Sequence, residues 1–225
     1  MGLLLSWLFA GCSPNKPRLN DVLVDGKQVK VHSTKATIQI VQLGEIEFPS
    51  GRVSPKDTMM LDVGAELDRV VPTSAGKAEA AIAKLASGDE RIAFLRVQFH
   101  PEPVERYELA IRKIDSKWHE SYREAYPVDS GYGGFIDFTV QEEVNGLFEA
   151  KDKDLTSRLH KELELQSKPT WSWSNFEIKS GVKILVASSG FGDGAYRTFY
   201  GLNSKDEVVS IVTDFNVVTT ELTKE

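Results

Sequence analysis

The clearest pattern of hydrophobic and polar positions in this chain covers Ile184–Phe215. An apolar run, Ile184–Ala187, leads into a glycine-rich loop, Ser188–Gly194. Two further runs of β-branched and aromatic residues follow, and the polar turn Asn203–Glu207 separates them. Runs of this composition, punctuated by Gly, Asn and Asp, are typical of antiparallel hairpins. The pattern therefore predicts strand, loop, strand, turn and strand in this order.

The N-terminal half shows further strand patterns. Val22-Leu23-Val24 and Val29–His32 flank Asp25-Gly26, a dipeptide typical of a tight hairpin turn, so we predict a hairpin there. Apolar and polar side chains alternate along Ala36–Leu43, which predicts a strand with one buried face.

Ala78–Leu85 is ambiguous. Its alanines favour helix by intrinsic propensity. The turn residues of Ser87–Glu90 and the half-buried strand pattern of Arg91–Phe99 favour the arm of a hairpin instead. We predict a strand, because the neighbouring hairpin signals agree with each other.

Helical patterns occur only in the middle of the chain. They predict a short helix within Asp115–Tyr126, a helix that begins after Thr139, and a helix over Leu155–Gln166. Thr139 and Glu142 have the spacing of a capping box. The last helix has an apolar stripe of Leu155, Leu159 and Leu163. The predicted fold class is α+β, a predominantly antiparallel β-sheet with two or three helices in the middle of the chain.

Composition supports a packed domain. Of 225 residues, 41% are hydrophobic and 27% are charged, close to ordinary globular usage. The formal net charge is -6, with 33 acidic against 27 basic residues, which argues against a nucleic-acid partner.

The N-terminus has the layout of a secretory signal. Gly2–Ala10 is apolar and uncharged, and Gly11-Cys12 follows it. Phe9–Cys12 resembles the lipobox of bacterial lipoproteins, in which the cysteine is acylated. We therefore expect residues 1–11 to be a signal segment, 12–20 a lipidated Cys12 with its tether, and 21–225 a single β-rich domain. The expected location is the bacterial cell envelope, lipid-anchored and facing the periplasm. The alternative is an apolar N-terminus with a chance cysteine.

Most catalytic templates are missing from the sequence. It contains no glycine-rich dinucleotide motif, no Walker loop and no G-x-S-x-G elbow. The four histidines are dispersed, and a single cysteine excludes a Cys-based zinc cage. We expect no cofactor and no metal site.

Aspartates beside glycines are the remaining candidates for chemistry. Asp129, Asp137 and Asp193 are candidate catalytic carboxylates, and Asp214 lies at a predicted strand end. Acids placed close together divide acid and base roles, and acids on loops bind hard cations. The alternative is structural, because Asp and Gly are also the preferred residues of turns.

These motifs together resemble the bacterial domain-of-unknown-function family numbered 4241, over Gly44–Phe215. The carrying pieces are Phe48–Arg52 with Asp57, Arg91–Phe99 leading to Glu102-Pro103-Val104, Pro127–Gly131 with Phe135-Ile136-Asp137, Asn175, Ser189–Tyr196 and Val212–Phe215. Lys56-Asp57-Thr58 stands where the family tends to read Cys-Asp-Pro, and Phe191 where Trp is usual. The resemblance implies no activity, but it makes site candidates of Asp129, Asp137, Asn175 and Asp193. The candidate binding residues are Asn175, Ser189, Gly190, Gly192, Asp193, Gly194 and Tyr196.

Two functional hypotheses follow from the sequence. The first is an envelope-anchored lipoprotein that binds a protein partner, in its most concrete form an immunity-type inhibitor of a toxin. The acylation signal and an acidic surface that suits a basic partner motivate it. The second is a carboxylate- or metal-dependent hydrolase that uses the aspartates. A structural envelope lipoprotein without a discrete ligand is a third possibility.

Overall fold

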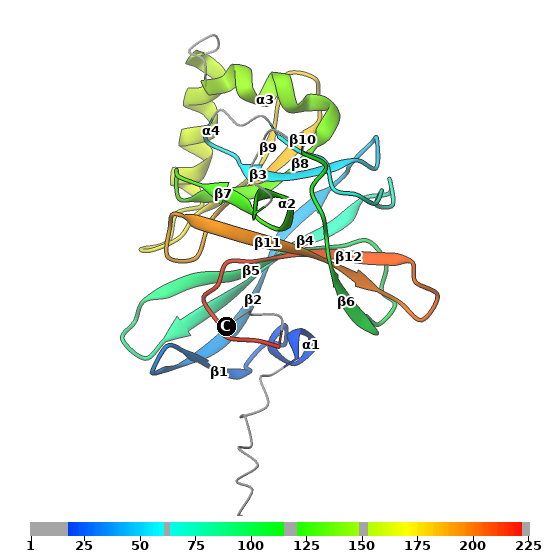
Figure 1. Cartoon of the computed structure of the whole chain (residues 1–225). Helices are drawn as coiled ribbons and strands as arrows, with labels where there is room; N and C mark the ends of the chain where they lie inside the picture. The colour runs from blue at the N-terminus through cyan, green and yellow to red at the C-terminus, as the bar shows by residue number, and fades with distance from the viewer. Residues whose placement is uncertain (1–17, 61–63, 115–120, 149–152, 222–225) are drawn as a thin grey trace, which may run out of the picture.

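Two antiparallel sheets and a helical layer make up the fold (Figure 1). The computed structural model describes residues 18–60, 64–114, 121–148 and 153–221. The large sheet consists, in spatial order, of β1 (Gln28–Val31), β2 (Thr34–Ile46), β4 (Gly76–Leu85), β5 (Glu90–Gln98), β12 (Val208–Asp214), β11 (Gly194–Leu202) and β6 (Arg106–Leu109), with β7 (Tyr126–Val128) also paired to β11. The small sheet has the order β3 (Val53–Asp57), β8 (Tyr132–Asp137), β10 (Lys183–Ser188) and β9 (Trp173–Glu177). The prediction of a β-rich, antiparallel fold with few helices is confirmed.

The helices lie mainly on the small sheet. The described helices are α1 (Leu19–Val22), α2 (Ser121–Glu124), the 3-10 turn η1 (Phe138–Val140), α3 (Gln141–Phe148) and α4 (Lys153–Leu165). Figure 1 shows α3 and α4 at the end of the molecule that carries the small sheet, away from most of the large sheet. Of the helices that the structure describes, none has the length and apolar character that a bilayer crossing needs.

The small sheet is buried on both faces. In β10, Leu185 and Ala187 belong to the core cluster between the two sheets. Ile184 and Val186 belong to a second cluster with the apolar stripe of α4. Because successive side chains of a strand point to opposite faces, only a continuous apolar run satisfies both clusters. The unbroken run Ile184–Ala187 is therefore the sequence signature of this middle position.

The glycine-rich loop carries the chain from one sheet to the other. β10 pairs with β8 and β9 in the small sheet, whereas β11 and β12 form a hairpin in the large sheet. The three predicted strands of Ile184–Phe215 are thus confirmed. The sequence did not show that the first of them belongs to a different sheet, because local patterns carry no information on pairing partners.

The ambiguous segment Ala78–Leu85 is a strand, as predicted. β4 pairs along its length with β2 on one side and with β5 on the other. Its alanines at 78, 80, 81 and 83 are all buried. Pairing and burial on both sides outweigh the helical propensity of alanine, which is a weak preference.

One local prediction near the N-terminus is wrong. Val22-Leu23-Val24 is not a strand: Leu19–Val22 forms α1, and the hairpin that follows has its turn at His32, between the paired residues Val31 and Thr34. Leu19, Val22 and Leu23 are all buried, at the i, i+3, i+4 spacing of a helix face.

The short helix predicted within Asp115–Tyr126 is present as α2. α2 ends at Glu124, and Tyr126 is a buried residue of β7. Tyr126 precedes Pro127, and a residue before proline is disfavoured in helical geometry. Residues 115–120 lie outside the described part of the chain. The helix over Leu155–Gln166 is confirmed as α4, with its leucine stripe buried.

The close packing in the middle of the small sheet predicts that replacing two glycines will have opposite effects on stability. A Cβ atom at Gly134 in β8 would lie 1.8 Å from the carbonyl oxygen of Leu185, whereas a Cβ at Gly146 in α3 would meet nothing within 4 Å. We expect Gly134→Ala to unfold the domain or to destabilise it by several kcal/mol, because the clashing atom is backbone of the adjacent strand. Gly146→Ala is the matched control and should stabilise by about 0.5–1 kcal/mol. Urea denaturation followed by circular dichroism measures both, and equal stability of the two variants would contradict the double-sided packing.

Candidate functional site

The carboxylate of Asp57 holds the turn between β7 and β8. It accepts hydrogen bonds from the backbone N–H groups of Asp129 and Ser130, at 2.8 and 2.9 Å, and from the Ser130 hydroxyl at 2.6 Å. It also accepts from the N–H of Met59 at 2.9 Å. Asp57 is buried, and these four bonds occupy both of its oxygens. Its arrangement is that of a structural carboxylate, with no lone pair directed at a cleft.

Asp137 has the same role at the other end of β8. It accepts from the backbone N–H and the hydroxyl of Ser50, and from those of Thr139, at distances of 2.5–2.9 Å. Asp137, rather than the predicted pair of Thr139 and Glu142, caps the helical segment that follows. Burial acts to raise the pKa of Asp137, but the four donors outweigh it and the pKa lies below its ordinary value.

The three candidate catalytic carboxylates are divided between two places. Val128 and Gly194 form the last pair of β7 with β11. Asp129 follows Val128 and Asp193 precedes Gly194, so the two aspartates lie on neighbouring loops beyond this pair. Both are exposed. Asp137 lies at the far end of β8, roughly 20 Å away by the rise of a strand. Among the described residues, no three His, Cys, Asp or Glu side chains are grouped in a way that could hold a metal ion.

The glycine-rich loop is closed by its own side chains. The Ser189 hydroxyl donates to the carbonyl of Gly192 at 2.8 Å, and the Tyr196 hydroxyl donates to the same carbonyl at 2.6 Å. Gly190 has a φ of +54°, and a Cβ there would lie 2.7 Å from the Phe215 carbonyl oxygen. Ser189, Gly190 and Tyr196 therefore build the loop, and the hydroxyl groups of Ser189 and Tyr196 donate within it.

The tip of this loop is an exposed aromatic ring. Phe191 is 47% exposed. The guanidinium carbon of Arg91 lies 5.3 Å from its ring centroid, and the ring of His32 lies 5.5 Å away. The tip contacts the start of β5 and the turn between β1 and β2, which keeps the loop against the large sheet.

Asn175, the remaining binding candidate, joins the two sheets. Its amide nitrogen donates to the backbone carbonyl of Glu45 in β2 at 2.6 Å. Near this contact the pairing of β2 with β4 is irregular between Gln42 and Gly44, and Gly44 has a φ of +93°. Asn175 pairs with Leu185, four residues before Ser189. The structure therefore places Asn175 about 13 Å along the sheet from the glycine loop.

A groove opens beside Asn175, between β2, β9, β10 and α4. It consists of two adjoining hollows of about 350 and 240 Å³ that share Glu45 and Lys183. We call this the edge groove. Its other lining residues are Leu43, Gly44, Glu47, Pro49, Glu162, Leu165, Gln166, Trp173, Ser174, Asn175, Gly181 and Val182.

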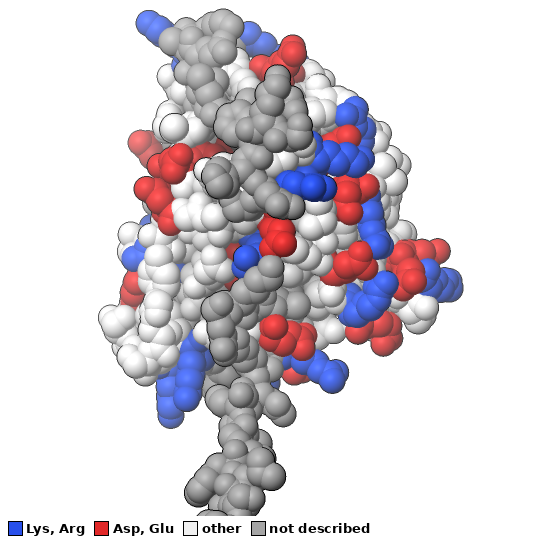
Figure 2. Space-filling model, viewed as in Figure 1, with Lys and Arg blue, Asp and Glu red and all other residues white. Residues whose placement is uncertain are grey.

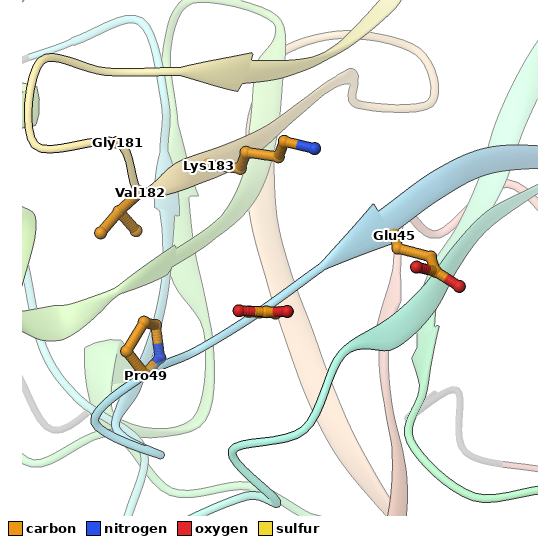
Figure 3. A pocket seen from close by; sticks show the side chains of 6 residues that line it. Glu45, Pro49, Gly181, Val182 and Lys183 are labelled. Carbon is orange, nitrogen blue, oxygen red and sulfur yellow. The ribbon is translucent and has the colours of Figure 1, made fainter.

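The edge groove is acidic and partly apolar. Figure 3 shows Lys183 and Glu45 extending from β10 and β2, two strands that border it. Among the described residues that line the groove, three are acids, Glu45, Glu47 and Glu162, and Lys183 is the one base. Neither Glu45 nor Glu47 forms an ion pair with a described residue. Figure 2 shows acidic and basic side chains interspersed on the right side of the face in view, and acidic side chains gathered at its left margin.

Comparison with known proteins places the chain in a family. The profile of a family described as "Protein of unknown function (DUF4241)" matches residues 46–213, about three quarters of the chain. The chain belongs to the DUF4241 family. No curated protein and no solved structure matches it.

Several positions that carry the DUF4241 resemblance make contacts between loops and strands. Asp57 and Asp137 tie down loops at the two ends of the β3–β8 pair, and Gly190 permits contact with Phe215. Lys56, which stands where the family tends to have cysteine, is fully buried and donates to the side-chain oxygen of Asn145 at 2.9 Å. Asn175 is the family-type position that also borders an open groove.

Sequence reasoning missed most of the edge groove. Glu45, Glu47 and Lys183 are ordinary charged residues at strand ends, and nothing in their local pattern marks them. Leu165 did carry a signal, because it lies off the stripe formed by Leu155, Leu159 and Leu163. An apolar residue on the polar face of a helix indicates an exposed contact.

We predict that the Asp137 carboxylate stabilises the folded state at neutral pH and that this stabilisation is lost in acid. Because the folded-state pKa is lowered, its contribution is complete above the ordinary value of 3.8 and is lost as the pH falls below it. We expect Asp137→Asn to destabilise by about 1–3 kcal/mol at pH 7. The difference from wild type should shrink as the pH falls below 3.8 in urea titrations. Asp129→Asn, at an exposed carboxylate, is the control and should change stability by less than about 0.5 kcal/mol.

For Asp214 we predict that stability depends on pH in the opposite direction. Burial raises the pKa of this carboxyl to about 7, although the backbone N–H of Asn216 and the charge of Arg197 act to lower it. The folded state therefore favours the neutral acid, and stability should fall as the pH rises from 3.8 to about 7. Asp214→Asn, which keeps an oxygen acceptor for Asn216, should remove this slope and be more stable than wild type at pH 8. Parallel pH profiles of wild type and variant would contradict the prediction.

Proposed function

We propose that the chain is a lipid-anchored envelope protein that binds a protein partner, and that the edge groove is its binding surface. In the most concrete form, the protein is an immunity-type inhibitor of a delivered toxin. The partner is expected to present basic residues, because the groove and the chain as a whole carry an excess of acids.

The exposed hydrophobic wall of the edge groove carries this proposal. Leu165 is 75% exposed, the largest exposed fraction among the large hydrophobic residues of the described chain. It borders the groove together with the half-buried Trp173. An exposed apolar anchor beside charged rim residues is the usual composition of a protein-binding surface.

The anchor rests on the N-terminal sequence. Cys12 follows the apolar segment Gly2–Ala10, and Leu19 is already buried in the core as part of α1. Seven residues from Cys12 to Leu19 span at most roughly 25 Å when extended. A lipid on Cys12 would thus keep the domain close to the membrane surface, and Cys12 itself lies outside the described residues.

The hydrolase alternative has less support from the geometry. Asp137 is fully buried and saturated by hydrogen bonds. Asp129 and Asp193 remain as two exposed acids on adjacent loops, and neither lines the edge groove. Paired catalytic carboxylates require a cleft between them that holds the substrate.

Metabolic labelling tests the anchor. We expect cells that express the full chain and grow on labelled palmitate to incorporate the label into this protein, and the protein to fractionate with membranes. Cys12→Ser should abolish both results, because the acylated thiol is removed. Label that persists in the Cys12→Ser variant, or a wild-type protein without label, would contradict the anchor.

Affinity purification tests the partner. A tagged full chain is recovered from detergent extracts of envelopes, and bound proteins are quantified by mass spectrometry. We expect one protein in stoichiometric amount that is lost when Leu165 is replaced by Lys, while the matched exposed substitution Val24→Lys retains it. For the immunity form, co-expression of the chain should restore growth of cells that produce this partner. Recovery of no stoichiometric protein would contradict binding.

A further inference from the structure

The strand β9 has an open edge that faces the edge groove. β9 is the last strand of the small sheet and pairs only with β10. The bonds from Ser188 to Ser172 and from Ile178 to Val182 show that even-numbered residues point their backbone groups at β10. The backbone N–H and C=O groups of Trp173, Asn175 and Glu177 therefore point outward, and within the described chain no hydrogen bond occupies them.

The other terminal strands are protected. On the opposite edge of the small sheet, the N–H of Leu67 donates to the carbonyl of Val53 in β3 at 2.8 Å. At one edge of the large sheet, Arg106 of β6 forms an ion pair with Asp206 at 3.0 Å. At the other edge, β1 is four residues long and exposes Gln28 and Lys30. Covering segments, charges and short length are the usual protections of an edge against pairing.

β9, at five residues, is also short, but it lacks a covering segment and a row of charges. Its sequence, Trp173–Glu177, has a single charged residue and no proline. β2 and α4 stand on its two faces and leave the edge accessible through the groove of about 350 Å³. This arrangement is the receptor geometry of β-strand addition, in which an extended segment supplies the missing neighbour.

The walls of the groove define the chemistry of that segment. Glu45 and Glu47 are exposed acids on the β2 side, and their carboxylates form no ion pair with a described residue. Leu165 supplies an apolar contact on the α4 side. A strand alternates its side chains, so it would direct basic residues to one wall and apolar residues to the other.

We infer that the partner binds by adding an extended, basic segment as a fifth strand to the edge of β9. This inference rests on the proposed function for the existence of a protein partner, and it adds the mode of recognition. The backbone of β9 supplies affinity through hydrogen bonds, and the acids of β2 select Lys and Arg over acidic residues.

Defined peptides test the edge without a known partner. The probe is a fluorescein-labelled nine-residue peptide that alternates Lys and Val, and its binding to the full chain is measured by fluorescence anisotropy. One control peptide replaces Lys with Glu, and another carries N-methyl groups along one edge and so cannot pair as a strand. We expect saturable binding of the basic peptide only. Absence of saturable binding of this peptide, or equal binding of the N-methylated one, would overturn strand addition.

A matched pair of variants locates the contact. Glu177→Pro removes one outward N–H, and proline is tolerated at an edge position whose N–H faces solvent. Glu177→Ala removes the same acid but retains the N–H. We expect the proline variant to bind the peptide about tenfold more weakly than the alanine variant, because a lost buried hydrogen bond corresponds to about one decade in affinity. Thermal unfolding confirms that both variants are folded, and equal affinities would overturn the assignment to β9.

Charge variants test the choice of a basic segment. Glu45→Gln with Glu47→Gln should weaken binding of the basic peptide, whereas Glu105→Gln with Glu142→Gln, at exposed acids elsewhere, should leave it unchanged. Sedimentation velocity measures whether a second copy of the chain, rather than a partner segment, occupies the edge of β9. A wild-type dimer that Glu177→Pro dissolves would overturn the partner segment in favour of self-association.

The two proposals fail in different ways. If envelope extracts yield no partner but the peptide binds the edge of β9, the function is wrong and the edge is a general strand receptor. If a stoichiometric partner is found that wild type and Glu177→Pro retain equally, the function stands and strand addition is overturned.

Discussion

The position of the small sheet between the large sheet and the helices constrains the rest of the structure. Its central strands, β8 and β10, must present apolar side chains to both neighbours, and their backbones approach so closely that no Cβ fits at Gly134. Such a sheet has no solvated face on which polar residues could be placed. Polar and functional groups are consequently confined to its ends and to its edges.

The ends of this sheet are occupied by structural carboxylates. Asp57 and Asp137 lie at opposite ends of the β3–β8 pair, and each accepts backbone N–H groups from a loop that crosses there. Buried backbone donors need partners, and a carboxylate serves several at once. This requirement accounts for Asp57 and Asp137 in the family-type motifs.

The two edges of the small sheet differ in what covers them. The segment that contains Leu67 lies on β3, while β9 faces a groove formed by β2 and α4. Asn175 keeps β2 and β9 together at this groove through its bond to the Glu45 carbonyl. The same contact that joins the two sheets therefore shapes the opening, which connects the packing of the core with the proposed recognition of a partner.

The sequence by itself determined the elements whose signals are local. The apolar run Ile184–Ala187, the leucine stripe of α4 and the alternation in β2 each follow from the faces that a strand or helix buries. The DUF4241 membership was also legible, because its motifs keep their order and spacing. Tertiary structure alone decided that β10 and β11 belong to different sheets, that Asp137 is separated from Asp129 and Asp193, and that Glu45 and Lys183 border one groove. These facts depend on which strands pair and which surfaces stack across long stretches of chain, and no window of neighbouring residues contains that information.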